Sequence, residues 1–235
     1  MKKKIVIVVA AFFLFTIPIY VKAEMTSYGF ISRAAITDDL TIDAGGWLWT
    51  WPSIVGGFGV NVTGELGNKF LDRLAVGAGL SYDHVNWTYY ADSSWSDIGI
   101  AGYAKYMIFN SKEMKKKVEF LPVNVSVLGG VKFNLYSFKI NGKKYGIGDD
   151  VTGTYYGYYD NFVVFNALFL VDYPLKYISD NDFLKNVTVT GYTGLLNSYF
   201  SGGVDFWYVP PKQKFSVKIG WIPLLGLSAD IMFAM

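Results

Sequence analysis

The chain has 235 residues, of which 52% are hydrophobic, 18% aromatic and only 17% charged, whereas an average soluble domain has roughly 25% charged residues. It contains no cysteine, which excludes a disulfide framework and a lipid-modified N-terminal cysteine. Beyond the N-terminus no apolar run approaches the roughly 18 residues that cross a bilayer as a helix, which argues against an all-helical membrane protein.

The first 23 residues have the pattern of an export signal. Residues 1–4 form a positive n-region with three lysines, residues 5–19 are apolar apart from Thr16 and Pro18, and residues 21–23 match a small-residue cleavage site. A retained membrane anchor is the alternative, but the apolar stretch is short for a span. We therefore expect cleavage near Ala23 and a mature domain over residues 24–235.

Cleavage would change the balance of charge. The whole chain has 21 basic and 19 acidic residues, and the signal removes four lysines, so the mature chain has 17 basic and 19 acidic residues and a net charge of about −2. A nucleic-acid partner is therefore not expected.

The mature chain alternates apolar and polar residues with period two, which is the pattern of β-strands. Eight runs are expected, near 41–50, 54–66, 71–87, 96–109, 118–138, 155–175, 185–208 and 213–233. The apolar parity switches within 185–208, which we interpret as a bulge at Gly202-Gly203. A ten-strand alternative adds residues 24–36 and splits the last run at Pro223. We favour eight because the odd-numbered apolar register continues through Pro223.

Several runs are too long for a β-sandwich, whose strands usually have five or six residues. Their polar faces carry small residues and scattered charges, and their apolar faces continue along the whole strand. A sheet that spans a bilayer must close so that every backbone polar group is paired. The sequence therefore predicts an all-β, antiparallel up-and-down transmembrane β-barrel, apolar outside and polar in the lumen, most simply of eight strands with ten as the alternative.

In the stretch GVNVTGELGNKFLDRLAVGAGLSYD, a strand, a tight turn and a glycine-rich strand follow one another. Together with the export signal, this pattern resembles the small outer-membrane β-barrel proteins of Gram-negative envelopes, such as outer-membrane proteins A and X and the opacity-type adhesins. The resemblance covers residues from about 40 to 235. It implies location in the outer membrane, periplasmic termini, contact with outer-membrane lipid, and insertion by the barrel-insertion machinery.

With eight strands, the outside connections are expected near 50–53, 83–96, 139–154 and 209–213, and the periplasmic turns near 67–70, 110–117 and 176–184. Aromatic residues gather at the outside end. We expect the following in or beside its loops: Trp87, Tyr89, Tyr90, Trp95, Tyr155 and Tyr156. They suit a ligand-stacking surface or the aromatic girdle that membrane barrels carry at the interface, and the girdle is the interpretation we favour.

The parity of the strands also selects the side chains that point into the lumen. The charged ones are Glu65, Lys105, Lys132, Asp205, Lys218 and Asp230, with Asp43 and Asp172 as further candidates. Eight strands leave space only for side chains, so we expect a closed ion-pair network in which Asp205 faces Lys218. A narrow pore lined by these charges is the alternative.

We expect no enzyme, no cofactor and no metal site. His84 is the only histidine, and the preceding Asp83 would point to the opposite face of the strand, although Ser93, Ser94 and Ser96 follow nearby. The expected function is structural or surface-interacting, of an adhesion type, through extracellular loops whose ligand is unknown. A passive channel for small solutes is the alternative, and an envelope lipid-modifying enzyme is a distant one.

Overall fold

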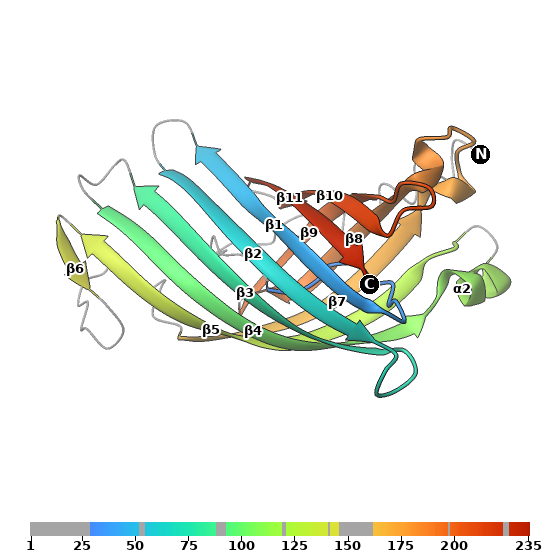
Figure 1. Cartoon of the computed structure of the whole chain (residues 1–235), viewed down its shortest axis with the longest axis horizontal. Coiled ribbons are helices and arrows are strands. Elements are labelled where there is room, and N and C mark those ends of the chain that lie inside the picture. The colour runs from blue at the N-terminus through green and yellow to red at the C-terminus, as the bar shows by residue number, and fades with distance from the viewer. Residues whose placement is uncertain are drawn as a thin grey trace.

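The computed structural model describes residues 29–51, 55–87, 93–118, 121–140, 142–145, 162–196, 198–222 and 226–235. The predicted export signal lies outside these residues. The described chain is almost entirely antiparallel sheet (Figure 1). Its strands are β1 Leu40–Trp51, β2 Val55–Gly67, β3 Leu74–Trp87, β4 Ser93–Phe109, β5 Asn124–Ile140, β6 Lys143–Tyr145, β7 Val163–Pro174, β8 Val187–Leu196, β9 Tyr199–Tyr208, β10 Phe215–Ile222 and β11 Gly226–Ala234.

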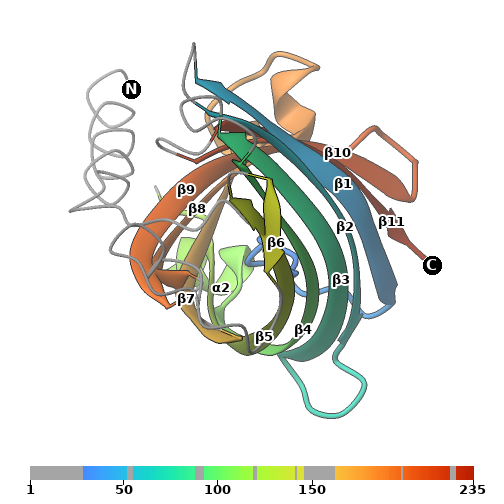
Figure 2. The ribbon, with the colours of Figure 1, turned by 90° about the vertical axis from the view of Figure 1, so that its left-hand side faces the viewer.

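The sheet closes on itself. Each long strand pairs with the neighbouring long strands in the chain, and β1 pairs with β11 to complete the ring (Figure 2). The three-residue β6 pairs only with the end of β5, so the other ten of the eleven strands form the wall. The predicted barrel is confirmed in its up-and-down architecture, and its strand number is the alternative of ten, not eight.

One of the two additional strands comes from the predicted run 185–208, which is the hairpin of β8 and β9. Leu196 pairs with Tyr199, an even with an odd position, so a two-residue connection joins the strands. Such a turn shifts the parity of the outward face. The switch that predicted a bulge at Gly202-Gly203 is therefore the signature of this turn, where Ser198 has a φ of 69°.

The second additional strand comes from 213–233, which is the hairpin of β10 and β11. Here Trp221 pairs with Leu227, so both partners are odd-numbered and three residues lie between Ile222 and Gly226. An odd number of connecting residues preserves parity, and the apolar register continues through the turn. Splitting at Pro223 is therefore correct, and the continuous register was no evidence against it.

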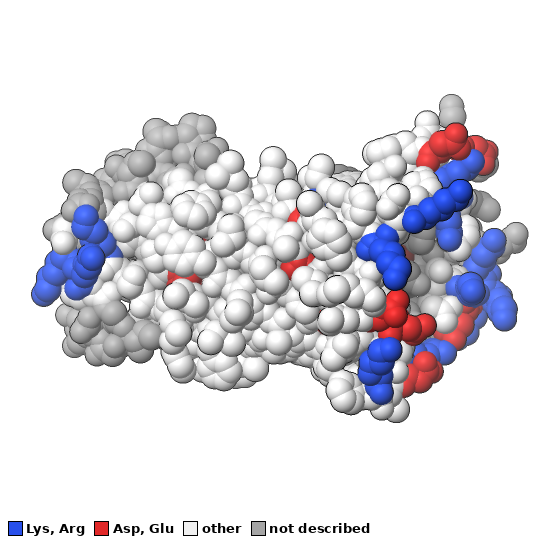
Figure 3. Space-filling model, viewed as in Figure 1, with Lys and Arg blue, Asp and Glu red and all other residues white. Residues whose placement is uncertain are grey.

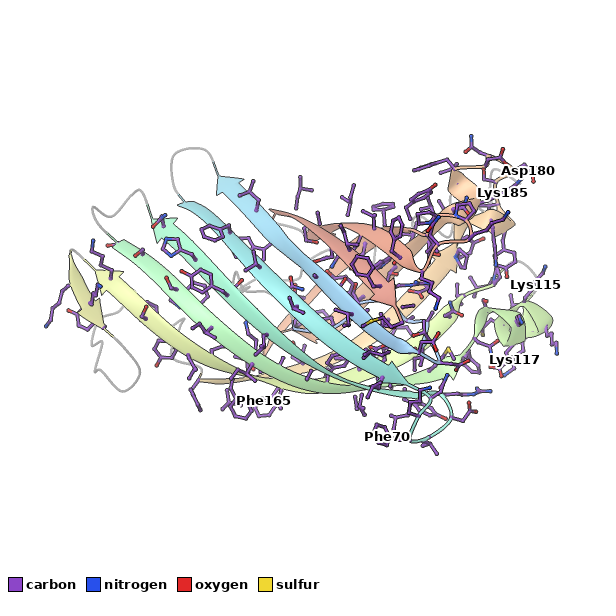
Figure 4. The ribbon with its side chains drawn as sticks, viewed as in Figure 1. Phe70, Lys115, Lys117, Phe165, Asp180 and Lys185 are labelled. Carbon is purple, nitrogen blue, oxygen red and sulfur yellow. The ribbon has the colours of Figure 1, made fainter. Side chains whose placement is uncertain are left out.

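The outer face of the wall is apolar. Exposed outward side chains include Leu48, Phe58, Val60, Val62, Leu80, Ile98, Ile100, Phe133, Phe165, Phe206, Ile219 and Ile231. Figure 3 shows a broad band almost free of charge between charged residues at the two ends, and Figure 4 shows Phe70 and Phe165 pointing away from the wall. This band has the character of a lipid-facing surface. None of the helices in the described residues has the length and apolarity needed to cross a membrane.

The two ends of the barrel differ. One end carries the turn 68–73, helix α2 (Ser111–Lys117), and the short 3-10 helices η1 (Leu175–Tyr177) and η2 (Leu184–Asn186). The connection 209–214 joins β9 to β10 at this same end. Its predicted place at the opposite end from the turns 67–70, 110–117 and 176–184 is therefore wrong, because the hairpin β8–β9 reverses the chain once more. The α2 end also holds the start of β1 and the end of β11.

Helix α2 begins with a capping box, in which the Asn110 side chain accepts from the Glu113 amide and Glu113 bonds back to the Asn110 amide. Arg73, in the β2–β3 turn, donates to both carboxylate oxygens of Glu113. The amide of Asn110 and the Arg73 guanidinium hold the pKa of Glu113 below its usual value. This pair ties the turn to the helix at the rim.

Candidate functional site in the barrel lumen

The lumen contains part of the chain itself. Residues 29–37, called the inner segment below, precede β1 and run inside the ring, where Figure 2 shows their trace surrounded by strands. Phe30, Ile31, Ser32 and Ala34 are all almost completely buried, with Ala34 at 0% exposure. The ten-strand alternative expected residues 24–36 to form a strand, but the described part of them adds none to the wall.

Asp172 on β7 anchors the inner segment. Its two carboxylate oxygens accept hydrogen bonds from the consecutive amides of Ala34, at 2.9 Å, and Ala35, at 2.8 Å. The Thr190 hydroxyl on β8 donates to the same carboxylate at 2.6 Å. Three donors surround this buried carboxylate, so the segment supplies part of the solvation that water would otherwise provide.

Other strands hold the same segment from different sides. Lys105 Nζ on β4 donates to the Arg33 carbonyl at 2.8 Å, and Ser126 Oγ on β5 donates to the Ala34 carbonyl at 2.5 Å. The Ser32 hydroxyl donates to Asp205 on β9. Because the partners come from β4, β5, β7 and β9, the segment crosses the lumen and does not lie along one wall.

Apolar contacts complete the seating of the segment. Phe30 meets Tyr103 edge-to-face, with ring centroids 6.3 Å apart, in a cluster with Leu128, Leu168 and Leu170. A second cluster consists of Ile31, Trp207 and Met232. The Trp207 ring points inward and is fully buried. Apolar side chains of the lumen wall therefore pack against apolar side chains of the inner segment. Burial of this apolar surface stabilises the segment inside the lumen.

Glycines in the wall make space for the segment. A Cβ at Gly79 would lie 2.8 Å from the Gly29 carbonyl oxygen, and one at Gly67 would lie 1.9 Å from the Thr37 carbonyl oxygen. Both positions are close backbone approaches that a larger residue would prevent.

All six predicted lumen charges point inward and are buried. Lys105 pairs with Glu65 at 2.8 Å, and Glu65 also accepts from the Tyr103 hydroxyl at 2.8 Å. Lys218 pairs with Asp230, its direct partner across β10 and β11. Asp205 is opposite Gly220, so it lies diagonally from Lys218 and bonds to Ser32 instead of forming the expected pair.

Farther from the α2 end, Lys132 lies between two carboxylates. Its Nζ is 3.3 Å from Asp97 and 3.6 Å from Asp83, and all three side chains are fully buried. Asp83 also accepts from the Trp47 indole at 2.8 Å. Neither Asp83 nor Asp97 is among the predicted lumen charges, although each continues the inward parity of its strand.

Near Lys132 and its two acids, Val85, Trp95 and Phe138 form a buried cluster inside the barrel. Trp95 was expected in an outside loop, but β4 begins at Ser93 and places it in the wall with its ring inward. Trp87 ends β3. The other four predicted loop aromatics, Tyr89, Tyr90, Tyr155 and Tyr156, lie outside the described residues.

Asp43 is a buried acid with fewer hydrogen-bond partners than Asp172. It is 1% exposed, and its Oδ1 has no hydrogen-bond partner among the described residues. It differs from Asp172, whose oxygens are fully engaged. Within the described part of the chain, no group of three or more acidic or histidine side chains has the arrangement of a metal site.

His84 lies on the outer face of β3, while Asp83 points into the lumen. Its Nδ1 is 2.8 Å from Ser96 Oγ on β4, and its Nε2 is 3.1 Å from Asn86 Oδ1. The Phe58 ring is 5.7 Å from the imidazole. No carboxylate among the described residues contacts this histidine. His84, Ser96 and Asn86 therefore form a polar cluster on the outer face, toward the end of the barrel away from α2.

A closed antiparallel barrel with an apolar outer band and a charged, buried interior defines the outer-membrane β-barrel class, and this chain has that architecture. No protein-family model matches the chain, and no curated protein sequence matches it.

Two of the solved structures to which the chain is similar have low TM-scores. Neisserial surface protein A has a TM-score of 0.33 and 12% identity, over 83% of this chain and 95% of that chain. The translocator domain of autotransporter NalP from Neisseria meningitidis has a TM-score of 0.36 and 10% identity, over 84% of this chain and 88% of that chain. The assignment to the class rests on the closed sheet and its two faces.

Proposed function

We propose that this chain is a non-conducting outer-membrane β-barrel with a structural or surface-interaction role of an adhesion type, exerted through its extracellular loops. The observation that carries the proposal is the inner segment, which crosses the lumen and is bonded to four strands. A solute path would have to displace it together with the ion pairs around Lys105 and Lys132.

The proposed orientation places the α2 end in the periplasm. The connection between β5 and β7 supports this, because it lies at the other end and is the longest in the wall, and such barrels carry their longer connections on the extracellular side. Export by a signal cleaved near Ala23, and insertion by the barrel-insertion machinery, belong to the same proposal. Cleavage there would leave residues 24–28 ahead of Gly29.

The proposed surface role draws support from the length of the wall. Strands β4 and β5 have 17 residues each, whereas about 9 to 11 residues cross a bilayer. With the α2 end fixed at the periplasmic face, the excess extends the sheet on the other side, where β6 pairs with β5. A rigid projection suits the display of loops to a surface partner, whose identity the proposal leaves open.

Single-channel recording in a planar bilayer tests the closed lumen. The refolded chain from residue 24 should give no steady conductance, and heat-modifiable gel migration should show that it is folded. A variant without residues 24–36 should give ohmic steps. Steady steps from the intact chain would replace this proposal with a passive channel.

The channel is the second candidate, and one observation favours it. Several buried polar atoms of the lumen wall, including Asp43 Oδ1, Thr63 Oγ1 and Ser216 Oγ, have no bonded partner among the described residues. Such groups are satisfied if water enters the lumen. In that case the inner segment would narrow a pore and not close it.

We also propose that no enzymatic step takes place at His84. The Ser96, His84 and Asn86 chain has a nucleophile and a base in contact, but no described carboxylate stabilises a charged imidazole. Treatment of the folded barrel with a fluorophosphonate probe should leave it unlabelled. Labelling that disappears in Ser96→Ala and persists in Ser137→Ala, the cross-strand neighbour of Ser96, would overturn this proposal.

A further inference from the structure

The outer wall is covered at one place by elements at the α2 end of the barrel. On β5 the outward Val125 is 8% exposed, whereas Val127, two residues along the same face, is 41% exposed. Val123 and Tyr173 are buried beside Val125. Met114 of α2, Leu175 of η1 and nearby apolar residues pack on them. Helix α2 and η1 are therefore held against the outside of the barrel, beside the lipid-facing band.

The surface of this covering is basic. Helix α2 turns Met114 toward the wall, and its lysines are exposed, as is Lys176 of η1. We call the following residues the α2 lysine patch: Lys112, Lys115, Lys116, Lys117 and Lys176. Figure 4 shows Lys115 and Lys117 on the helix at the end of the barrel, well separated from Asp180 and Lys185 on the neighbouring connection.

Aromatic rings hold three of these lysines close to the wall. The ammonium groups of Lys115 and Lys176 each lie 5.2 Å from the centroid of the Tyr177 ring, from two different elements. Lys117 Nζ lies 4.5 Å from the centroid of Phe109. A lysine over an aromatic ring at the edge of an apolar band is placed at the height of lipid head groups.

No acid among the described residues forms an ion pair with a lysine of the patch. Glu113 is the only acid within α2, and its carboxylate is engaged by Arg73 and by the Asn110 amide. Asp182 is paired with Lys185. The patch thus concentrates positive charge at one sector of the rim, where a negatively charged surface would relieve the repulsion among the lysines.

We propose that the α2 lysine patch binds the anionic phospholipid head groups of the leaflet at this end of the barrel. The partner is a phosphate-bearing lipid surface, because the patch adjoins the lipid-facing wall and its lysines rise from rings at that border. The inference requires only that the barrel spans a membrane, so it does not depend on the lumen being closed.

Native mass spectrometry of the folded mature chain tests the proposal, from micelles that contain equal phosphatidylglycerol and phosphatidylethanolamine. The intact chain should retain phosphatidylglycerol about tenfold better, and added salt should reduce the preference. The triple variant K115Q/K116Q/K117Q should retain the two lipids within about twofold of each other. Heat-modifiable migration checks that each variant is folded.

The matched control is K69Q/K212Q/K214Q, which removes three exposed lysines at the same end but outside the patch. It should keep the preference for phosphatidylglycerol. An equal loss in both triple variants would mean that net charge alone acts, and would overturn the proposal. So would an intact chain without preference, or displacement of the lipid by inorganic phosphate, which would indicate a site for a free anion.

Discussion

The two halves of the lumen are closed by different means. In the half nearer α2, the chain itself fills the space, and backbone amides of the inner segment satisfy Asp172 while Lys105 serves both Glu65 and the Arg33 carbonyl. In the other half no described backbone segment enters, and Lys132 lies between Asp83 and Asp97 below a cluster of Val85, Trp95 and Phe138.

The difference shows two ways of burying carboxylates in a barrel. In the half nearer α2, a segment that is not part of the wall places neutral amide donors against a buried carboxylate. Loss of these hydrogen bonds releases the segment. A single lysine between two acids supplies charge, but it leaves both acids uncompensated when it is lost. We therefore expect the lysine-centred half to be the more sensitive to a single substitution.

The largest effect is expected from Lys132→Met. The substitution leaves Asp83 and Asp97 buried without their lysine, and should destabilise the folded barrel by about 3–5 kcal/mol. Urea titration in detergent micelles, followed by tryptophan fluorescence, measures the change. Lys144→Met, on the exposed β6, is the control and should have little effect. Equal stability of both variants would remove the contrast between the two halves.

Asp172→Ala should have the next largest effect. The amides of Ala34 and Ala35 and the hydroxyl of Thr190 lose their acceptor, which we expect to cost about 2–3 kcal/mol in the same titration. Release of the inner segment should also produce intermittent conductance in a planar bilayer. A variant that is destabilised but electrically silent would show that Asp172 supports the wall and not the segment.

Gly79→Ala should act through the inner segment as well. Its Cβ would meet the backbone of Gly29 and the Thr63 hydroxyl within 2.9 Å, and overpacking of this kind costs about 1–3 kcal/mol. Gly102→Ala is the matched control, because a Cβ at Gly102 meets nothing within 4 Å. If both alanines are tolerated equally, the segment does not lie against β3.

Asp43→Asn is expected to have the smallest effect and the opposite sign. Asn removes a buried charge whose Oδ1 has no described partner, so the folded state should be unchanged or more stable by about 1 kcal/mol. Urea titration of this variant beside Asp172→Asn gives the comparison directly. A clear loss of stability in Asp43→Asn would mean that favourable interactions stabilise the Asp43 carboxylate in the folded barrel, and would contradict this prediction.

The sequence predicts the barrel because the period-two pattern follows the alternation of lipid and lumen along each strand. It predicts the strand number poorly. The period-two pattern shows which positions share a face of the sheet, but it does not show where the chain reverses direction. Across β10–β11 the apolar positions keep the same parity, because an odd number of residues connects the strands. Across β8–β9 their parity switches, because two residues connect the strands. Neither pattern separates a turn from a long strand without knowledge of the pairing.

The lumen charges could be selected by the same parity, and the six selected side chains are all inward. Their partners could not, because register across strands decides whether Lys218 meets Asp205 or Asp230. The inner segment has no strand pattern of its own. Its contacts, from Ser32 to Asp205 and from Ala34 to Asp172, join residues 173 and 138 positions apart, which a local reading cannot find.

The most direct test of the account is the accessibility of position 34. The chain has no cysteine, so Ala34→Cys and Asp38→Cys each introduce a single thiol. Ala34 is fully buried in the lumen, whereas Asp38 is exposed at its mouth. Reaction of the folded barrels with a water-soluble maleimide should be at least about a hundredfold slower at position 34, as expected for a site reached only by opening. Equal rates at the two positions would place the inner segment outside the lumen and contradict the account.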